Sequence, residues 1–360
     1  MRIALAAGGT AGHILPALAT LGALRAKGAP VEARFFGPDN RGERSLVQGH
    51  DVPFEAVPAA PLRGRSPLAI GRGLVCTGIG VGAAISSLRR FRPNVMLSTG
   101  GYGSFPASLA ARILGLPLVV FLPDVKPGLA VRAESYLATL IAAATDAALP
   151  ELPAGKTVVS GYPVRNAFHT SREEARKSLG WATDERVLLV TAGTQGAQAI
   201  NRTIWKALPQ LCEIARVVHV TGKGNEEAKT ARASLPETLR DQYEPTPFRE
   251  DLPALMVAAD LAIMRAGAST LGEIPAAGLP ALLIPGTFAG GHQRNNAWWL
   301  AGHGAAFVIE ETKLETLKRH AIDLLHDDAQ RGSMAKAARS AGDTEGAERL
   351  ATILQEVATK

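Results

Sequence analysis

The segment from Met264 to Glu273 carries the residue types that a nucleotide diphosphate requires. It reads Met-Arg-Ala-Gly-Ala-Ser-Thr-Leu-Gly-Glu and follows an apolar run that predicts a buried strand. A helix then begins, which Ser269 or small residues near it can cap, and the N–H groups of its first turn attract anions such as phosphates. Glu273 lies one turn further, where its carboxylate can accept hydrogen bonds from a ribose diol. An ordinary strand–helix turn with a solvated glutamate has the same pattern.

A second candidate is a glycine loop near the N-terminus that ends in a histidine. Gly8-Gly9-Thr10-Ala11-Gly12-His13 follows a short apolar run and precedes apolar residues at helical spacing from Ile14 to Lys27. Strand, glycine loop and helix cradle phosphates in doubly wound folds, although this spacing is neither GxGxxG nor a Walker P-loop. An imidazole at this position can take a proton from an alcohol. A capping or structural histidine is the alternative.

The elements that must position these residues alternate between strand and helix. Apolar runs predict strands at 2–7, 31–37, 94–99, 116–122, 157–160, 186–192, 217–221, 259–264, 281–285 and 306–309. The alternation predicts parallel sheets with helices on both faces, and glycine loops follow the strands at 8–13, 100–104 and 193–197. Such sheets bind ligands at the carboxyl ends of their strands.

A Pro- and Gly-rich segment, 150–163, divides the chain into two domains. We expect one domain at 1–162 and a second at 163–345, with the amphipathic helix 346–360 packing back on the first. Each domain is predicted to be a doubly wound, Rossmann-like α/β unit with a glycine loop facing a common cleft.

Composition restricts the partners. The 360 residues are 46% hydrophobic and 20% charged, which is typical of a globular chain, and the net charge of +6 favours anionic ligands. Aromatic residues are only 5%, which argues against binding single-stranded nucleic acid. Cys76 and Cys212 are far apart without a Cys/His cluster, and no acidic cluster indicates a divalent metal. We therefore expect neither nucleic acid nor metal, and a reducing compartment is consistent.

The segment 61–93 differs from the rest of the chain. Arginines flank an apolar stretch, 73–88, that is shorter than the roughly 20 residues needed to span a bilayer. Glycines at 78, 80 and 82 weaken a helix there. An apolar surface rimmed by arginines fits shallow contact with anionic lipid, and a core helix with solvated ends is the alternative.

Six motifs in one order carry a resemblance to a known family. They are the loop 8–13, Gly100-Gly101-Tyr102, Gly161-Tyr162-Pro163-Val164-Arg165, Gly193-Thr194-Gln195-Gly196-Ala197, the segment 265–273, and the segment from His292-Gln293 to Asn296-Ala297. Across nearly its full length the chain resembles the MurG family, which transfers N-acetylglucosamine to lipid I to form lipid II in peptidoglycan synthesis. The resemblance implies a GT-B fold, no cofactor, and a peripheral location on the cytoplasmic face of the membrane.

The resemblance also implies roles for individual residues. The donor, UDP-N-acetylglucosamine, would lie mainly on the C-terminal domain, with Glu273 on the ribose and Arg249 beside the uracil. The remaining donor contacts would be the helix start at Ala268, Ser269, Thr270, Leu271 and Gly272, together with Arg165, Thr194, Gln195 and Gln293. On the acceptor side, Thr10, Ala11 and Gly12 would close on the diphosphate and Asp124 would lie near the undecaprenyl-linked acceptor. His13 would be the general base for an inverting attack by the acceptor's 4-hydroxyl, with no metal required.

Departures from the family concentrate in the acceptor-side half. Ala11 stands where the family has glycine, Phe121-Leu122-Pro123-Asp124 replaces a His-Glu-Gln-Asn segment, and Tyr162 replaces an asparagine. These departures leave open a transferase with another lipid-linked acceptor. Two alternatives from other classes also stay open: a UDP-sugar 2-epimerase and a nucleotide-sugar binding protein without catalysis.

Overall fold

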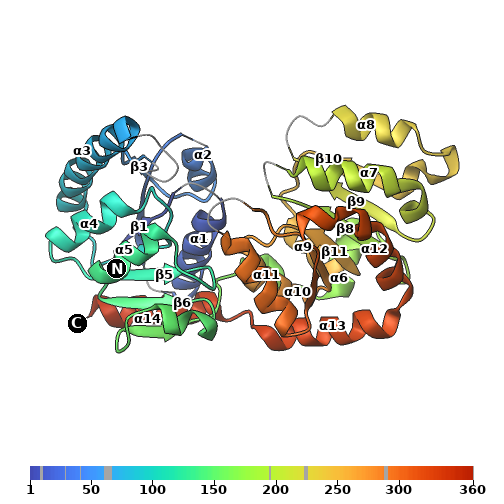
Figure 1. The fold of residues 1–360 in the computed structure, drawn as a ribbon. Coiled ribbons are helices and arrows are strands. Elements are labelled where there is room, and N and C mark those ends of the chain that lie inside the picture. Colours follow the sequence, from blue (N-terminus) through green and yellow to red (C-terminus); the bar gives the residue numbers. More distant parts are fainter. Residues whose placement is uncertain are drawn as a thin grey trace. The chain divides into compact units, whose positions relative to one another are not determined.

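The computed structural model describes residues 1–8, 11–28, 30–40, 42–60, 67–193, 196–222, 226–287 and 291–359. The chain forms two compact units, one of residues 1–165 with 345–360 and the other of residues 166–344 (Figure 1). The first unit extends to Arg165, beyond the expected boundary at 162.

The first unit is built on a seven-stranded parallel sheet. Its strands are β1 (Arg2–Ala6), β2 (Glu32–Gly37), β3 (Phe54–Ala56), β4 (Val95–Ser98), β5 (Leu118–Leu122), β6 (Leu140–Ala143) and β7 (Thr157–Val159). The order is β3-β2-β1-β4-β5-β6-β7, so the direction of winding reverses between β1 and β4. The helices of this unit are α1 (Ala11–Ala26), α2 (Glu43–Gln48), α3 (Pro67–Phe91), α4 (Phe105–Ile113), α5 (Leu129–Leu137) and α14 (Gly346–Ala358), with a 3₁₀ turn at Asp146–Glu151.

The second unit repeats the plan on a six-stranded parallel sheet. Its strands are β8 (Val187–Thr191), β9 (Arg216–Val220), β10 (Tyr243–Thr246), β11 (Leu261–Met264), β12 (Ala281–Leu283) and β13 (Ala306–Val308). The order is β10-β9-β8-β11-β12-β13, with the reversal between β8 and β11. Its helices are α6 (Arg172–Leu179), α7 (Gln198–Cys212), α8 (Glu226–Ala233), α9 (Leu252–Ala258), α10 (Thr270–Ala277), α11 (His292–Gly302), α12 (Leu317–His326) and α13 (Asp328–Ala341). Short 3₁₀ turns lie at Asn166–His169, Glu237–Gln242 and Glu311–Thr316.

The central strands are apolar along their whole length because helices cover both faces of each sheet. All residues of β5 and β8 are buried, as are all those of β4 and β11. Parallel sheets covered in this way have continuous apolar strands rather than alternating ones. The prediction of a doubly wound α/β fold is confirmed.

The first helix begins earlier than its apolar spacing indicates. α1 starts at Ala11, so His13 lies in the first helical turn rather than at the end of a loop. The predicted loop was too long because alanine is the best helix former and the first N–H groups of a helix need no partner within it. Gly12 therefore destabilises the helix little at this position, and the first turn includes it.

Candidate functional site

The switch point of the first unit is formed by two glycine loops in direct backbone contact. The Gly8 N–H donates to the Gly100 carbonyl at 3.3 Å. A Cβ on Gly101 would lie 2.0 Å from the Gly8 carbonyl oxygen, and Gly101 has a φ of +86°. Only glycine tolerates both this close contact and this positive φ, so the two loops can approach each other this closely only because residue 101 is glycine. Ligands of doubly wound sheets bind in the crevice at such a reversal of strand order.

His13 lies beside this pair of loops. Thr99 donates from its hydroxyl to the His13 carbonyl at 2.6 Å, and the His13 ring carbon Cδ2 lies 3.7 Å from the position of a Cβ on Gly100. The side chain is half-buried. The structure therefore places His13 at the carboxyl end of β1, next to the loop that follows β4.

The other acceptor-side residues lie at the same sheet edge or outside the described residues. Ala11 and Gly12 form the start of α1, and Asp124 is half-buried just after β5, the strand beyond β4. Thr10 lies outside the described residues. Within the first unit, His13 and Asp124 thus lie at the same edge of the sheet, after β1 and β5, with β4 between these two strands.

A buried carboxyl group that the sequence analysis missed underlies the loop after β4. Glu134 in α5 is 0% exposed and accepts hydrogen bonds from the hydroxyls of Ser98, Ser104 and Ser108 at 2.7–2.9 Å. Burial raises the pKa of Glu134 to about 7, although the three hydroxyls favour the charged form. The Ser104 Oγ also lies 2.8 Å from the Gly101 carbonyl oxygen, so this cluster is in contact with the glycine loop. The sequence signal that could have indicated this cluster was the pair Ser104 and Ser108, four residues apart at the start of α4.

In the second unit, α10 begins without the expected side-chain cap. Ser269 occupies the N-cap position but makes no capping hydrogen bond. The Gly267 carbonyl instead accepts from the Thr270 N–H at 3.0 Å and the Thr270 hydroxyl at 2.6 Å. The prediction of a Ser269 cap was wrong because a tight turn from Gly267 winds the chain into the helix, which leaves Ser269 with helical backbone angles.

The residues predicted to hold the diphosphate and the ribose lie together at the start of α10. Thr270, Leu271, Gly272 and Glu273 are buried in the first turn, while Ala268 and Ser269 are half-buried just before it. Glu273 is 7% exposed and is the only acidic residue of that turn. The positive end of the helix dipole faces the same region, which favours a phosphate beside residues 268–270.

Polar side chains from the neighbouring strand end support this helix start. Gln293 in α11 accepts a hydrogen bond from the Gly286 N–H at 2.8 Å through Oε1, and buried Asn296 donates to the Ala266 carbonyl at 3.3 Å. Arg265 binds both carboxylate oxygens of Glu311, at 2.9 and 3.2 Å. The loops after β11 and β12 are therefore held together by side-chain contacts.

The remaining predicted donor residues are less central. Arg249 follows the edge strand β10 and is paired with Glu244 and Asp251, each at 2.6 Å. Hydrogen bonds to Asp251 raise the pKa of Arg249 above its usual range. Arg165 is half-buried at the end of the first unit, and Thr194 and Gln195 lie outside the described residues.

A second buried cluster, also missed from sequence, lies below the loop after β8. His219 in β9 is 0% exposed, with the Tyr243 hydroxyl at 3.0 Å from Nδ1 and the Asn201 side-chain oxygen at 3.0 Å from Nε2. Asn201 donates to the Thr221 carbonyl at 2.9 Å, and that carbonyl oxygen lies 2.3 Å from where a Cβ on Gly196 would be. Burial lowers the pKa of His219 to about 3. The cluster thus anchors the start of α7 beside Gly196.

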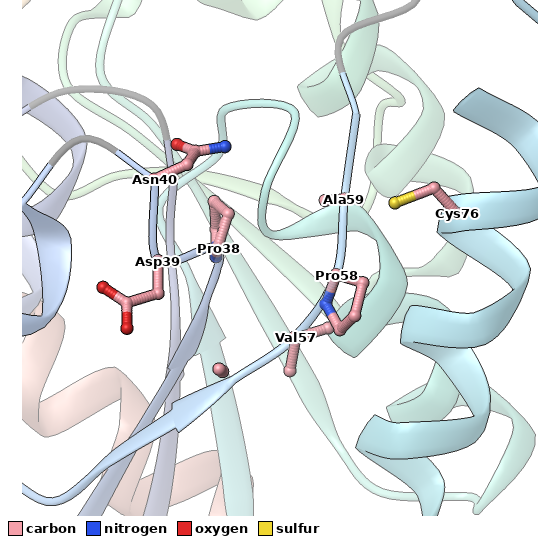
Figure 2. Close-up of a pocket in the computed structure, with 8 residues that line it drawn as sticks. Pro38, Asp39, Asn40, Val57, Pro58, Ala59 and Cys76 are labelled. Atoms are coloured by element: carbon pink, nitrogen blue, oxygen red, sulfur yellow. The ribbon is translucent and has the colours of Figure 1, made fainter. Parts of the chain in front are cut away.

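A small hollow in the first unit contains none of the predicted site residues. It has a volume of about 230 Å³ and lies between the segments that follow β2 and β3 and the helix α3. Figure 2 shows Pro38 to Asn40 on one side, Val57 to Ala59 beside them, and Cys76 projecting from α3. Among the residues that the structure describes, no group of three or more His, Cys, Asp or Glu could hold a metal ion.

Helix α3 presents an exposed apolar face. It is longer than the predicted stretch 73–88, and by length and composition the window Gly71–Phe91 could cross a membrane. Only 28% of that window is buried, and Leu74, Val75 and Ile79 are 57–65% exposed. The alternative of a core helix was wrong for the face that carries Leu74, Val75 and Ile79, because a core helix would bury these side chains. Gly80 explains the close packing on the other side, where a Cβ would lie 2.0 Å from the Pro58 carbonyl oxygen.

Known proteins resemble the chain along its length. Residues 3–142 match the N-terminal domain of glycosyltransferase family 28, and residues 187–350 match its C-terminal domain. Curated relatives carry the name UDP-N-acetylglucosamine–N-acetylmuramyl-(pentapeptide) pyrophosphoryl-undecaprenol N-acetylglucosamine transferase. The relative from Roseiflexus sp. (strain RS-1) is 36% identical over 99% of this chain and 94% of its own length. The relative from Desulforudis audaxviator (strain MP104C) is 34% identical over 100% of this chain and 99% of its own length.

Solved structures share the fold. The crystal structure of Acinetobacter baumannii MurG superposes with a TM-score of 0.76 at 24% identity, covering 99% of each chain. A UDP-GlcNAc 2-epimerase from Neisseria meningitidis bound to UDP-GlcNAc superposes with a TM-score of 0.67 at 16% identity, covering 99% of this chain and 100% of that one. Because a transferase and an epimerase share this fold, the sequence identity over the full length, and not the fold, indicates the family. The chain belongs to the MurG family within glycosyltransferase family 28 and has its GT-B architecture of two Rossmann-like domains.

Proposed function

We propose that this chain transfers N-acetylglucosamine from UDP-N-acetylglucosamine to lipid I and so forms lipid II in peptidoglycan synthesis. The observation that carries the proposal is the identity of 34–36% to two named transferases over nearly the whole length of both partners. The predicted site residues also follow the carboxyl ends of strands in each unit, where doubly wound folds bind ligands.

In this proposal the second unit binds the donor. Glu273 accepts hydrogen bonds from the ribose hydroxyls, and the helix start at 268–270 holds the diphosphate. Gln293 has its oxygen on Gly286, so its side-chain amide N–H₂ is the group that can turn to the donor. Arg249 lies by the uracil with its charge already balanced by Glu244 and Asp251, which suits it to packing and hydrogen bonding with a neutral base. Thr194 and Gln195 complete the donor contacts of the second unit, and Arg165, the last residue of the first unit before the second begins, is proposed to bind the donor as well.

The first unit supplies the acceptor chemistry in this proposal. The acceptor's 4-hydroxyl oxygen bonds to the anomeric carbon of the donor as the bond from that carbon to the diphosphate oxygen breaks, which inverts the configuration. The hydroxyl proton passes to the imidazole of His13, and UDP leaves with the bonding electrons. Positive charge at the start of α10 stabilises the leaving diphosphate. Asp124, which follows β5 at the same edge of the sheet, is the next candidate base.

A transfer assay tests this function. The enzyme is incubated with UDP-N-acetylglucosamine and lipid I, and the lipid product is analysed by mass spectrometry. We expect lipid I to gain one N-acetylhexosamine with release of UDP. An epimerised UDP-sugar and unchanged lipid would instead identify a 2-epimerase. Bound donor without turnover would identify a binding protein, and transfer only to a different lipid-linked sugar would change the acceptor.

The exposed apolar face of α3 is proposed to contact an anionic membrane surface on the cytoplasmic side without spanning it. Leu74, Val75 and Ile79 supply the apolar contact, and Arg72 at one end with Arg89 at the other supply positive charge. Arg90 beside Arg89 is paired with Glu55 at 3.5 Å.

Co-sedimentation with anionic vesicles tests this contact. We expect binding at low salt and release at high salt, because surface charge attraction is screened over about 10 Å at 0.1 M. A variant with serine at Leu74, Val75 and Ile79 should bind weakly. Val159→Ser, which changes a 43% exposed residue on the edge strand β7, is the matched control and should bind normally. Binding that ignores salt and lipid charge would contradict the electrostatic part.

A further inference from the structure

A proline interrupts the hydrogen bonds of α1 in the turn that carries His13. Pro16 lies inside the helix and has no N–H, so it cannot donate to the Gly12 carbonyl four residues earlier. Its ring also crowds that carbonyl. Gly12 is half-buried, and a carbonyl withdrawn from water needs another donor to remain stable.

Tyr162 supplies this donor. Its hydroxyl donates to the Gly12 carbonyl at 3.1 Å. The side chain is 5% exposed, and its ring packs edge-on against Phe121, with ring centroids 5.7 Å apart and an angle of 74° between the planes. A buried tyrosine held in this way directs its hydroxyl to one place.

The backbone around Tyr162 is fixed as well. A Cβ on Gly346, the first residue of α14, would lie 2.5 Å from the Tyr162 carbonyl oxygen, so the two backbones are in close contact. Arg349 of the same helix donates from Nε to the Ser160 carbonyl at 2.8 Å. The segment 160–162 therefore packs against α14, and these contacts fix the backbone from which the Tyr162 ring extends.

Two successive carbonyls in the first turn of α1 are thus held by side chains from other elements. The Gly12 carbonyl accepts from Tyr162, and the His13 carbonyl accepts from the Thr99 hydroxyl at 2.6 Å. Thr99 follows β4, whereas Tyr162 follows β7. Because the two donors come from separate strand ends, the turn is fixed in position as well as in conformation.

We propose that Tyr162 is a positioning residue for the transfer reaction, whose hydroxyl replaces the helix hydrogen bond that Pro16 removes and thereby aims the His13 imidazole. Phe121 supports it by fixing the ring. The inference rests on the proposed function, in which His13 accepts the acceptor's proton. In this proposal Tyr162 acts through the first turn of α1 and not through contact with a reacting atom.

The first test removes only the hydroxyl. Tyr162→Phe keeps the ring against Phe121, and we expect kcat to fall about 10- to 100-fold with an unchanged donor KM, because a catalytic group displaced by about 1 Å loses that order of rate. Tyr136→Phe is the matched control. Its side chain is 77% exposed in the same unit, and it should match the wild-type protein. A Tyr162→Phe enzyme with normal kcat would falsify the proposal.

The second test restores the missing helix bond. Pro16→Ala returns an N–H four residues after Gly12, so Tyr162→Phe combined with Pro16→Ala should recover most of the lost kcat. A double variant as slow as Tyr162→Phe alone would show that the hydroxyl acts elsewhere and would overturn the proposal. Phe121→Leu keeps the hydroxyl but loosens the ring, and should lower kcat less than Tyr162→Phe.

A third measurement is independent of transfer activity. Hydrogen exchange followed by mass spectrometry reports the protection of amides at the start of α1. Tyr162→Phe should increase exchange there while Tyr136→Phe does not, and adding Pro16→Ala should restore protection. Unchanged exchange in Tyr162→Phe would overturn the positioning role even in an active enzyme. If the variants show these differences in exchange but the wild-type protein fails to modify lipid I, only the proposed function is contradicted.

Discussion

The two units place their glycine loops on buried polar clusters of opposite acid–base character. In the first unit three serine hydroxyls converge on Glu134, a carboxyl group whose pKa burial raises to about 7. In the second unit a tyrosine hydroxyl and an asparagine amide enclose His219, whose pKa burial lowers to about 3. Burial favours the neutral form in both clusters, but a neutral acid and a neutral base respond to pH in opposite directions.

The sign of each response follows from proton binding. Folded Glu134 holds its proton more tightly than the unfolded side chain, so its contribution to stability is full below pH 4.5 and is lost as the pH rises to about 7. Folded His219 holds its proton less tightly than the unfolded side chain, so its contribution is full above pH 6.5 and is lost as the pH falls to about 3. The first unit is thus weakened towards neutral pH and the second towards acid.

The largest expected effect separates the chemistry of the first unit from the binding of the second. His13→Ala should lower turnover about 100- to 10,000-fold with little change in donor affinity, because the proposed general base is lost. The acid limb of the pH–rate profile should disappear with it. Kinetics at saturating substrates and calorimetry with UDP-N-acetylglucosamine check this. Near-normal turnover would transfer the role of base to Asp124, and lost donor affinity would indicate a loop-orienting role.

The next effect concerns acid stability of the second unit. Between pH 6.5 and about 3, His219 should account for a loss of roughly 5 kcal/mol in the free energy of unfolding, from a shift of 6.5 to about 3 at about 1.4 kcal/mol per pH unit. All four tryptophans, at 181, 205, 298 and 299, belong to this unit, so tryptophan fluorescence in urea isolates its unfolding. His219→Gln should flatten the pH dependence. An equally steep dependence in the variant would assign it to other groups.

A smaller effect of opposite sign is expected in the first unit. Between pH 4.5 and 7, Glu134 should account for a loss of roughly 3 kcal/mol, from a shift of 4.5 to about 7. Hydrogen exchange of peptides from β4 and α4, measured across this range, reports it without interference from the second unit. Glu134→Gln keeps a neutral side chain at every pH and should remove the dependence. Protection that rises with pH in the wild-type protein would contradict the assignment.

The smallest effect tests donor binding alone. Glu273→Ala should raise the donor dissociation constant about 100-fold, because the two charge-assisted hydrogen bonds proposed between Glu273 and the ribose, each worth about 1.5 kcal/mol, would be lost. Thermal unfolding followed by tryptophan fluorescence gives a second readout, since ligand at about 100 times its dissociation constant adds roughly 2.7 kcal/mol. UDP should stabilise the wild-type protein and NAD should not. An unchanged dissociation constant in Glu273→Ala would remove that residue from the donor site.

Patterns confined to a few neighbouring residues could be predicted from sequence. Apolar runs gave the central strands, such as β8 and β11, because burial on both faces demands continuous apolar residues. The strands β3, β6 and β10 were missed. β10 contains Pro245, which an edge strand tolerates because one side makes no ladder hydrogen bonds, whereas sequence reasoning treats proline as a strand breaker.

Features that depend on distant residues could not be predicted. The Glu134 cluster joins residues 26 to 36 positions apart, and the Tyr162 bond to Gly12 joins residues 150 positions apart. No local pattern encodes such pairs. The substitutions at Phe121 and Tyr162 were visible as two separate departures, and only the structure shows that the two rings touch.

The return of α14 to the first unit sets an order for folding during synthesis. α14 packs against α1, and Lys27 donates to the Thr352 hydroxyl at 2.6 Å (Figure 1). The second unit is continuous in sequence, so all its residues leave the ribosome before α14 does. The first unit, although synthesised first, must wait for the C-terminus to cover α1. A nascent chain therefore carries an incompletely covered N-terminal unit through most of translation, and a stop codon before α14 would leave that apolar helix surface exposed to chaperones and proteases.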